Sequence, residues 1–331
     1  MNYLITGATG LIGRRLIEQI VYKAGRGITV LVLPVRNIPE AQKQFEEYRK
    51  QEKADIIYVE CDLEHMVKEK FDIGINIDYL IHCAAPTMSA YMIANPVETV
   101  DAIVLGTKNA LELARYFKVT SMVYLSSMEV YGVVEDKGTE REEDELGEID
   151  LTSSRSCYSL GKRMAEHYCY IYLKEYGVPV KIARLSQVFG RGVRESDNRV
   201  FMQFARAAVE QKDIVLKTEG KSLGNYCETE DTVKAILTIL KKGTDGEVYN
   251  VVNEENTMTI REMANLVADK IACGGIRVRI RLEDLSKTGY APDTGLRLSG
   301  KKLRMLGWRP SKNLEQMYAD VIEEIETFGL E

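Results

Sequence analysis

A short apolar strand at the start of the chain runs directly into a glycine-rich turn and then into a helical pattern. Residues 2–6 form the predicted strand, glycines stand at Gly7, Gly10 and Gly13, and the helical pattern continues to about Tyr22. Glycines at this spacing let the backbone turn tightly and approach a pyrophosphate, to which the first amides of the helix can donate hydrogen bonds. A plain strand-to-helix turn is the simpler alternative, but this position in the chain favours a dinucleotide site.

Strands and helices alternate through the first part of the chain and mix less regularly after residue 192. Strands are predicted at residues 28–33, 56–59, 79–85, 121–125, 180–185, 214–216, 247–251 and 276–280, and helices at 39–53, 95–117, 158–176, 199–211, 230–242, 259–271 and 314–327. The alternation predicts an α/β fold, a Rossmann-like doubly wound parallel sheet with a smaller C-terminal substrate lobe. We expect a dinucleotide-binding domain over residues 1–192, to which 230–255 returns, and a lobe over 193–331 that mostly binds substrate.

The residues after the second and third strands bear on the choice of cofactor. NAD-binding folds of this class often place an acid at the end of the second strand, where it bonds the ribose hydroxyls. Here Arg36 follows that strand and no acid stands beside it. Arg36 either meets the 2′-phosphate of NADP or is simply solvated, and the sequence leaves both open. Asp62, after the third strand, is placed to receive the adenine amino group, and residues 135–150 form an acidic, exposed loop.

A tyrosine and a lysine stand four residues apart near the start of the helix at 158–176. Tyr158 and Lys162 therefore project from one helix face, one turn apart. A nearby lysine cation favours the phenolate, so we expect Lys162 to lower the pKa of Tyr158. That would suit Tyr158 to exchange a proton with a substrate hydroxyl. Ser127 and Glu129 follow the strand at 121–125, at the sheet edge where open parallel sheets bind ligands.

Composition limits the classes of partner. The 331 residues carry a net charge of −6 and no basic block, which disfavours nucleic acid and anionic membranes as partners. No apolar run approaches the roughly 20 residues of a membrane span, and the start of the chain does not look like a signal peptide, so we expect a cytoplasmic protein. The six cysteines and three histidines are scattered, which predicts no metal site.

With these motifs assembled, the chain resembles the extended short-chain dehydrogenase/reductases, the NAD-dependent epimerase/dehydratase family, over nearly its whole length. The matching residues are Thr6 to Gly13, Asp62, Leu63, His82, Ala84, Ala85, Gly106, Thr107, Ser127, Tyr158, Lys162 and the stretch Leu306 to Pro310. The segments around Glu129 and from Arg155 to Arg163 are most similar to UDP-glucuronate decarboxylases.

The resemblance implies roles for particular residues. Tyr158 would be the acid/base, Lys162 would hold the nicotinamide ribose, Ser127 would bond the reacting oxygen, and Glu129 would assist. Cofactor-binding residues would be Gly7, Thr9, Gly10, Leu11, Ile12, Gly13, Arg36, Asp62, Leu63, Cys83, Ala84, Ala85, Tyr158, Lys162, Leu185 and Val188. Substrate contacts would come from Thr87, Gln187, Arg191, Arg194 and Arg297. The helices at 97–117 and 158–176 would form a homodimer interface.

Three departures from the family pattern limit the carry-over. Met128 stands where dehydratases carry an aspartate, and a thioether cannot protonate a leaving hydroxyl. Ile103 replaces a usual asparagine. Gly224 aligns near an arginine that commonly binds the substrate diphosphate. The first departure argues against 4,6-dehydration, and the other two question the usual handling of a nucleotide sugar.

Two enzymatic hypotheses and one of another class follow. In the first, NAD+ stays bound while a nucleotide-activated sugar is epimerised or decarboxylated, in the synthesis of surface polysaccharide precursors. In the second, NADPH reduces a nucleotide-linked keto sugar, or a ketose to a nucleotide-linked polyol, which suits Arg36. The third is a non-catalytic dinucleotide sensor or scaffold. The presence of Ser127, Tyr158 and Lys162 together disfavours it.

Overall fold

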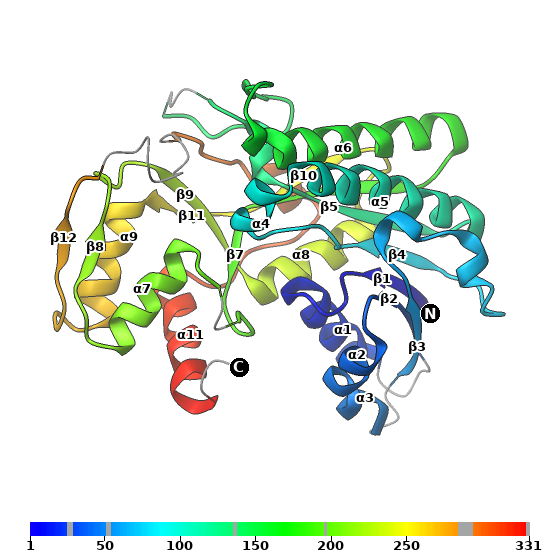
Figure 1. The fold of residues 1–331 in the computed structure, drawn as a ribbon, viewed down its shortest axis with the longest axis horizontal. Helices are drawn as coiled ribbons and strands as arrows, with labels where there is room; N and C mark the ends of the chain where they lie inside the picture. The colour runs from blue at the N-terminus through cyan, green and yellow to red at the C-terminus, as the bar shows by residue number, and fades with distance from the viewer. Residues whose placement is uncertain (25–28, 51–53, 135–137, 195–196, 284–293, 329–331) are drawn as a thin grey trace.

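One seven-stranded parallel sheet forms the centre of the protein in the computed structural model, which describes residues 1–24, 29–50, 54–134, 138–194, 197–283 and 294–328 (Figure 1). Its strand order is β10-β6-β5-β4-β1-β2-β3. These strands are β1 (Asn2–Thr6), β2 (Val30–Val35), β3 (Asp55–Glu60), β4 (Tyr79–His82), β5 (Ser121–Ser127), β6 (Val180–Leu185) and β10 (Val248–Val251). All neighbouring pairs are parallel, so the carboxyl ends of all seven strands lie at one edge.

Helices cover both faces of this sheet, as the doubly wound prediction requires. Figure 1 shows α5 and α6 on one face and α1 and α8 on the other, and each pair packs on its own hydrophobic core. The helices of this layer are α1 (Leu11–Ala24), α2 (Ile38–Gln44), α3 (Glu46–Lys50), α4 (Ser89–Ala94), α5 (Pro96–Phe117), α6 (Cys157–Tyr176) and α8 (Thr229–Lys242). The α/β, Rossmann-like prediction is confirmed.

A smaller lobe carries a third core beside the carboxyl edge of the sheet. Its strands are β7 (Gln187–Phe189), β9 (Leu223–Glu228) and β11 (Asn253–Thr259) in one sheet and β8 (Ile214–Leu216) and β12 (Val278–Ile280) in another. Its helices are α7 (Val200–Val209), α9 (Ile260–Leu266) and α11 (Leu314–Phe328), whereas α10 (Lys301–Met305) packs on β10 and the core of the large sheet. Phe189, Phe201, Tyr226 and Tyr318 fill its centre.

Several predicted boundaries differ from the structure. The helix expected over 39–53 is two helices, α2 and α3, which meet at Phe45, and residues 51–53 lie outside the described part. The strand expected from residue 28, itself outside the described part, begins at Val30 and runs through Pro34 to Val35. The helix expected over 259–271 continues past α9 as a π-helical turn, Val267–Ile271. Strands β7, β9 and β11 were not predicted.

Two observations bear on how the chain divides. β10, within the segment expected to return to the first domain, pairs with β6 in the large sheet. The acidic loop, described from residue 138, is bound to the C-terminal segment because the Arg141 amide donates to the Arg297 carbonyl at 2.7 Å. The domain boundary at residue 192 remains a prediction. Within the described residues, every helix is too short or too polar to span a bilayer.

Candidate active site

The glycine turn is pressed against the end of β4. Gly7 has a φ of +66°, and a Cβ added to it would lie 2.9 Å from the backbone of Ala84. A Cβ on Gly13 would lie 2.2 Å from the Gly7 carbonyl oxygen, whereas one on Gly10 would lie 3.3 Å from the same atom. The Gly10 amide donates to the Gly7 carbonyl at 3.0 Å. The bare backbone at the start of α1 therefore fits the close approach of a pyrophosphate.

The other predicted cofactor residues gather at the same edge of the sheet. Each lies in the glycine turn, at or just after the carboxyl end of a strand, or in β7. They are Thr9, Leu11, Ile12, Arg36, Asp62, Leu63, Cys83, Ala84, Ala85, Leu185 and Val188. Arg36 and Asp62 are exposed. The Thr6 hydroxyl accepts from the Ala84 amide at 3.2 Å and contacts His82 Nδ1 at 2.7 Å, which ties β1 to the turn after β4.

The segment after β3 is held by a residue that the sequence analysis did not single out. Asn109 of α5 donates its side-chain amide to the carbonyls of Leu63 and Glu64 at 2.9 and 3.0 Å. Gly106, one turn earlier, leaves room for the Leu63 side chain, which a Cβ there would meet at 3.0 Å. Asn109 thus fixes the position of Asp62 through its neighbour. The sequence signal for Asn109 was only its closeness to the Gly106 motif.

Tyr158 and Ser127 meet at the carboxyl end of β5. Tyr158 lies in the first turn of α6, is 7% exposed, and shares a hydrogen bond with the Ser127 side chain. Burial raises the pKa of Tyr158, and the nearby Glu129 carboxylate adds to the rise. In the protein without a cofactor, the Tyr158 phenol is therefore protonated at neutral pH and can donate its proton.

Lys162 does not act on Tyr158 as predicted. Its ammonium lies 5.8 Å from the Tyr158 ring centroid and donates to the Leu125 carbonyl at 2.7 Å. Burial lowers the pKa of Lys162 to about 8. The expectation that Lys162 lowers the Tyr158 pKa is wrong, because burial of the phenol outweighs a cation held by a backbone carbonyl.

Glu129 is held beside Tyr158 by an arginine. Arg155 bonds both carboxylate oxygens of Glu129, at 3.1 and 3.0 Å. The Ser159 hydroxyl lies 3.5 Å from the same carboxylate. This two-point contact fixes the plane of the carboxylate as well as its position. The sequence analysis named Arg155 only as part of the segment from Arg155 to Arg163 and did not predict its contact with Glu129.

A buried ion pair lies behind these residues. Glu166, one turn after Lys162 on α6, accepts from the Ser126 hydroxyl at 2.5 Å and from Arg184 Nε and Nη2 at 2.9 and 2.8 Å. The Glu166 and Arg184 side chains are 11% and 4% exposed. Glu166 also favours the charged form of Lys162. Glu166 and Arg184 therefore hold α6, β5 and β6 together next to Ser127.

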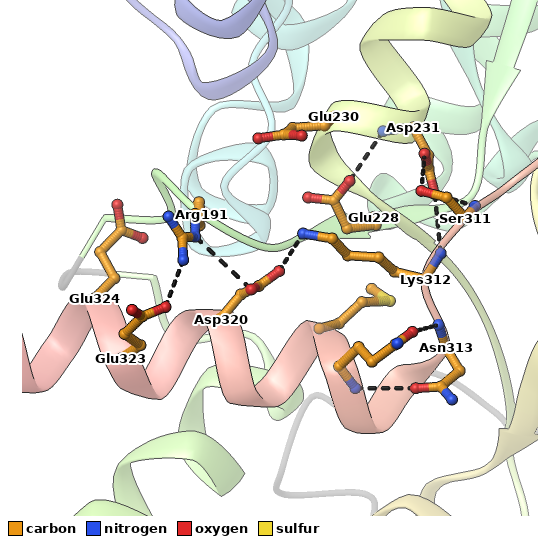
Figure 2. Close-up of polar contacts among 12 residues, drawn as sticks. Arg191, Glu228, Glu230, Asp231, Ser311, Lys312, Asn313, Asp320, Glu323 and Glu324 are labelled. Carbon is orange, nitrogen blue, oxygen red and sulfur yellow. Dashed lines mark hydrogen bonds and ion pairs between the residues drawn. The ribbon is translucent and has the colours of Figure 1, made fainter.

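The predicted substrate residues are placed in different surroundings. Thr87 is exposed after β4, and Gln187 begins β7. Arg191 forms ion pairs with Asp320 and Glu323 of α11 (Figure 2).

Two further predicted substrate residues, Arg194 and Arg297, contact other segments of the chain. Arg194 donates to the Thr9 carbonyl at 3.0 Å, so it lies on the glycine turn. The Arg297 backbone carbonyl accepts a hydrogen bond from the Arg141 amide.

Position 224 cannot carry a side chain in this fold. A Cβ added to Gly224 would lie 2.3 Å from the Tyr226 hydroxyl, whose ring covers that side of β9. Tyr226 is fully buried and packs edge-on against Phe189 at 5.8 Å. The space that an arginine would occupy there is part of the hydrophobic core of the small lobe. Among the described residues, no group of three or more His, Cys, Asp or Glu side chains could hold a metal ion.

Sequence comparisons place these features among known proteins. The profile of the NAD dependent epimerase/dehydratase family matches residues 3–252. UDP-glucuronic acid decarboxylase 1 of Danio rerio is 29% identical over 314 residues, covering 95% of this chain and 70% of the relative. UDP-glucuronic acid decarboxylase 6 of Arabidopsis thaliana is 26% identical over 318 residues, covering 96% and 86%.

Solved structures share the fold over nearly the whole chain. A UDP-glucose 4-epimerase of Thermotoga maritima with UDP-glucose superposes with a TM-score of 0.80 at 20% identity, covering 98% of this chain and 99% of that one. A UDP-glucuronic acid 4-epimerase of Bacillus cereus, in complex with UDP-glucuronic acid and NAD, gives 0.78 at 21% identity, covering 98% and 99%.

The glycine turn makes a stability prediction. We expect Gly13→Ala to lower the free energy of unfolding by about 2 kcal/mol, because its Cβ would overlap the Gly7 carbonyl and force the backbone apart. Gly10→Ala is the matched control and should cost less, since its Cβ is only tightly placed. Urea denaturation measures both. Equal losses in the two variants would contradict the packing described for the turn.

Proposed function

Because the chain belongs to the NAD dependent epimerase/dehydratase family, we propose that it is an NAD-dependent decarboxylase of a nucleotide-linked uronic acid. One observation carries this choice within the family. Glu129 is fixed by Arg155 beside Tyr158 and Ser127, at the carboxyl edge of the sheet. The similarity to UDP-glucuronic acid decarboxylases supports the substrate class, and Met128 argues against 4,6-dehydration. The product would serve as a polysaccharide precursor.

The residues have distinct tasks in this proposal. Tyr158 takes the proton from the substrate hydroxyl during oxidation and returns it to the keto oxygen during reduction. Ser127 bonds the same oxygen and the phenol, which keeps the two aligned. Lys162, anchored on the Leu125 carbonyl, holds the nicotinamide ribose through its ammonium. The Glu129 carboxylate faces the reacting ring on the side fixed by Arg155.

The glycine turn fits a dinucleotide, and the cofactor would complete the chemistry. A nicotinamide dinucleotide bound at this edge would accept and return the hydride, and the positive charge of its oxidised ring would favour the Tyr158 phenolate. Gly7 and Gly13 would border its pyrophosphate. Arg194, which already reaches the Thr9 carbonyl, would add a cation there. Asp62, held through Asn109, would receive the adenine amino group.

A direct assay tests the reaction. We expect the purified protein to release about one NAD+ per chain on denaturation, and to convert UDP-glucuronate to a product lighter by one CO2, detected by mass spectrometry. Tyr158→Phe should slow turnover at least ~100-fold, because it removes the proton carrier. Activity should also decline as pH rises through about 8, where Lys162 loses its charge.

The same assay separates the alternatives. A product of unchanged mass but altered stereochemistry would indicate epimerisation, and full activity of Tyr158→Phe would remove Tyr158 from the acid/base role. Tyr170→Phe is the matched control, since that tyrosine lies on α6 but is 49% exposed on its outer side. A protein that binds no dinucleotide would refute the assignment of the glycine turn.

Arg36 favours a second candidate, an NADPH-dependent reductase of a nucleotide-linked keto sugar or ketose. Its side chain is exposed just after β2, where a 2′-phosphate would be read. In this case we expect Arg36→Ala to raise the dissociation constant for NADPH at least about tenfold while leaving that for NADH unchanged. Lys43→Ala, on the neighbouring α2, is the control. Equal binding of the two dinucleotides by wild type and Arg36→Ala would make Arg36 a solvated side chain.

We also propose that α5 and α6 form a homodimer interface. The two helices lie side by side (Figure 1). Both leave apolar side chains exposed. Leu105 and Tyr116 of α5 are 41% and 51% exposed, and Met164 of α6 is 49% exposed. Apolar patches that persist on a helix pair mark protein contacts.

Sedimentation equilibrium tests the dimer. The wild type should have the mass of two chains, and Leu105→Asp should shift it towards one, because the interface would then bury a charge. Tyr22→Asp, at an exposed aromatic on the opposite face of the sheet, should leave the mass unchanged. A wild type that sediments as a single chain would remove the proposal.

A further inference from the structure

Residues 190–194, called the strap below, join the small lobe to the glycine turn. They follow β7 and make two hydrogen bonds to the start of the first domain. Arg14, directly after the last glycine of the turn, donates to the Gly192 carbonyl at 2.7 Å. Arg194 donates to the Thr9 carbonyl, inside the turn, at 3.0 Å. The strap is thus bound to the interior of the turn that the proposed function assigns to a pyrophosphate, and to the residue that follows this turn.

The C-terminal helix holds the strap from the other side. Glu324 of α11 accepts the Gly192 amide at 2.7 Å. Figure 2 shows Arg191 between the α11 carboxylates of Asp320 and Glu323, to which it is ion-paired. Asp320 is in turn paired with Lys312, at the loop before α11. Asp320, Glu323 and Glu324 share one helix face because they are three and four residues apart.

Gly192 is the point where these contacts meet. Its amide is bound by α11 and its carbonyl by Arg14 of α1, so a shift of α11 must move the group that Arg14 holds. Its φ of +86° is one that residues with side chains rarely adopt. The hydrogen bonds on its amide and on its carbonyl therefore hold Gly192 between α11 and α1.

The charges around the strap suit an anion. Burial lowers the pKa of Arg14, the nearby Arg194 and Arg15 add to this effect, and Glu324 and Glu18 oppose it. Two guanidinium groups beside bare backbone amides repel each other unless an anion lies between them. In the contacts described above, each arginine offers one nitrogen to a carbonyl. A pyrophosphate at the turn would bring both cations a charge-assisted partner.

We propose that Glu324 is a positioning residue for the dinucleotide, which through the Gly192 backbone holds Arg14 and Arg194 at the glycine turn. The inference rests on the proposed function, in which that turn binds the pyrophosphate. It makes cofactor affinity depend on α11, a helix of the small lobe. The position of the lobe that would bind the sugar would then affect how tightly the cofactor is bound.

Dinucleotide affinity tests this proposal. Isothermal titration with NAD+ and with NADP+, on protein stripped of copurified nucleotide, should give dissociation constants at least about fivefold higher for Glu324→Ala than for wild type. Glu324→Gln keeps an oxygen that can accept from Gly192 and should restore most of the affinity. Glu326→Ala removes an exposed carboxylate of the same helix and should bind as wild type does. The thermal midpoint of each unliganded variant checks the fold.

The outcomes separate this inference from the function it rests on. Wild-type binding by Glu324→Ala, with normal affinity for either dinucleotide, would overturn the inference and leave the function standing. No binding by the wild type would overturn both. If Glu324→Ala unfolds, Arg191→Gln is tested instead, because it removes the exposed ion pairs between the strap and α11. Weaker binding by that variant at an unchanged thermal midpoint supports the inference, and unchanged binding refutes it.

Discussion

The buried pair of Glu166 and Arg184 is the interaction on which the arrangement of the candidate active site depends. It joins α6 to β5 and β6, and Glu166 also binds the Ser126 hydroxyl next to Ser127. Removing one partner of such a pair typically costs about 3–5 kcal/mol, because the other charge stays buried alone. Two apolar side chains in these positions would lack the directional hydrogen bonds that orient Arg184 and Glu166 relative to each other. The charged pair fixes the distance between the end of β5 and the face of α6 that carries Tyr158 and Lys162.

The glycine turn and the meeting of Ser127 with Tyr158 could be predicted because their signals are local. Gly7 to Gly13 specify a strand, a tight turn and a helix within one short stretch, and Tyr158 and Lys162 share a helix face at a spacing of four. Parallel topology then brings Ser127 to the same edge without any further information. The alternation of strands and helices also predicts the large parallel sheet, which the structure confirms.

What the sequence did not reveal depends on contacts between distant segments. β9 pairs with β11 on one side and with β7 on the other, so this small sheet forms from distant segments. Neither β9 nor β11 shows a strong strand pattern in its own sequence. The sequence predicts Arg191 as a substrate contact and gives no sign of its ion pairs with carboxylates more than a hundred residues away on α11. Lys162 failed to lower the Tyr158 pKa because its ammonium is held by the Leu125 carbonyl and the phenol is buried. Spacing along a helix predicts which side chains are neighbours, but not which solvation each one has.

The departures from the family pattern become consistent when taken together. Gly224 leaves no place for a side chain, since the Tyr226 ring closes that part of β9 into the core. Two cations lie instead at the glycine turn, where Arg194 binds the Thr9 carbonyl and Arg14 of α1 binds the Gly192 carbonyl. A cation beside a helix N-terminus adds to the backbone amides there in attracting an anion, and the start of α1 provides such amides. An arginine at position 224 would have to displace the Tyr226 ring, whereas cations beside the start of α1 need no change in the core.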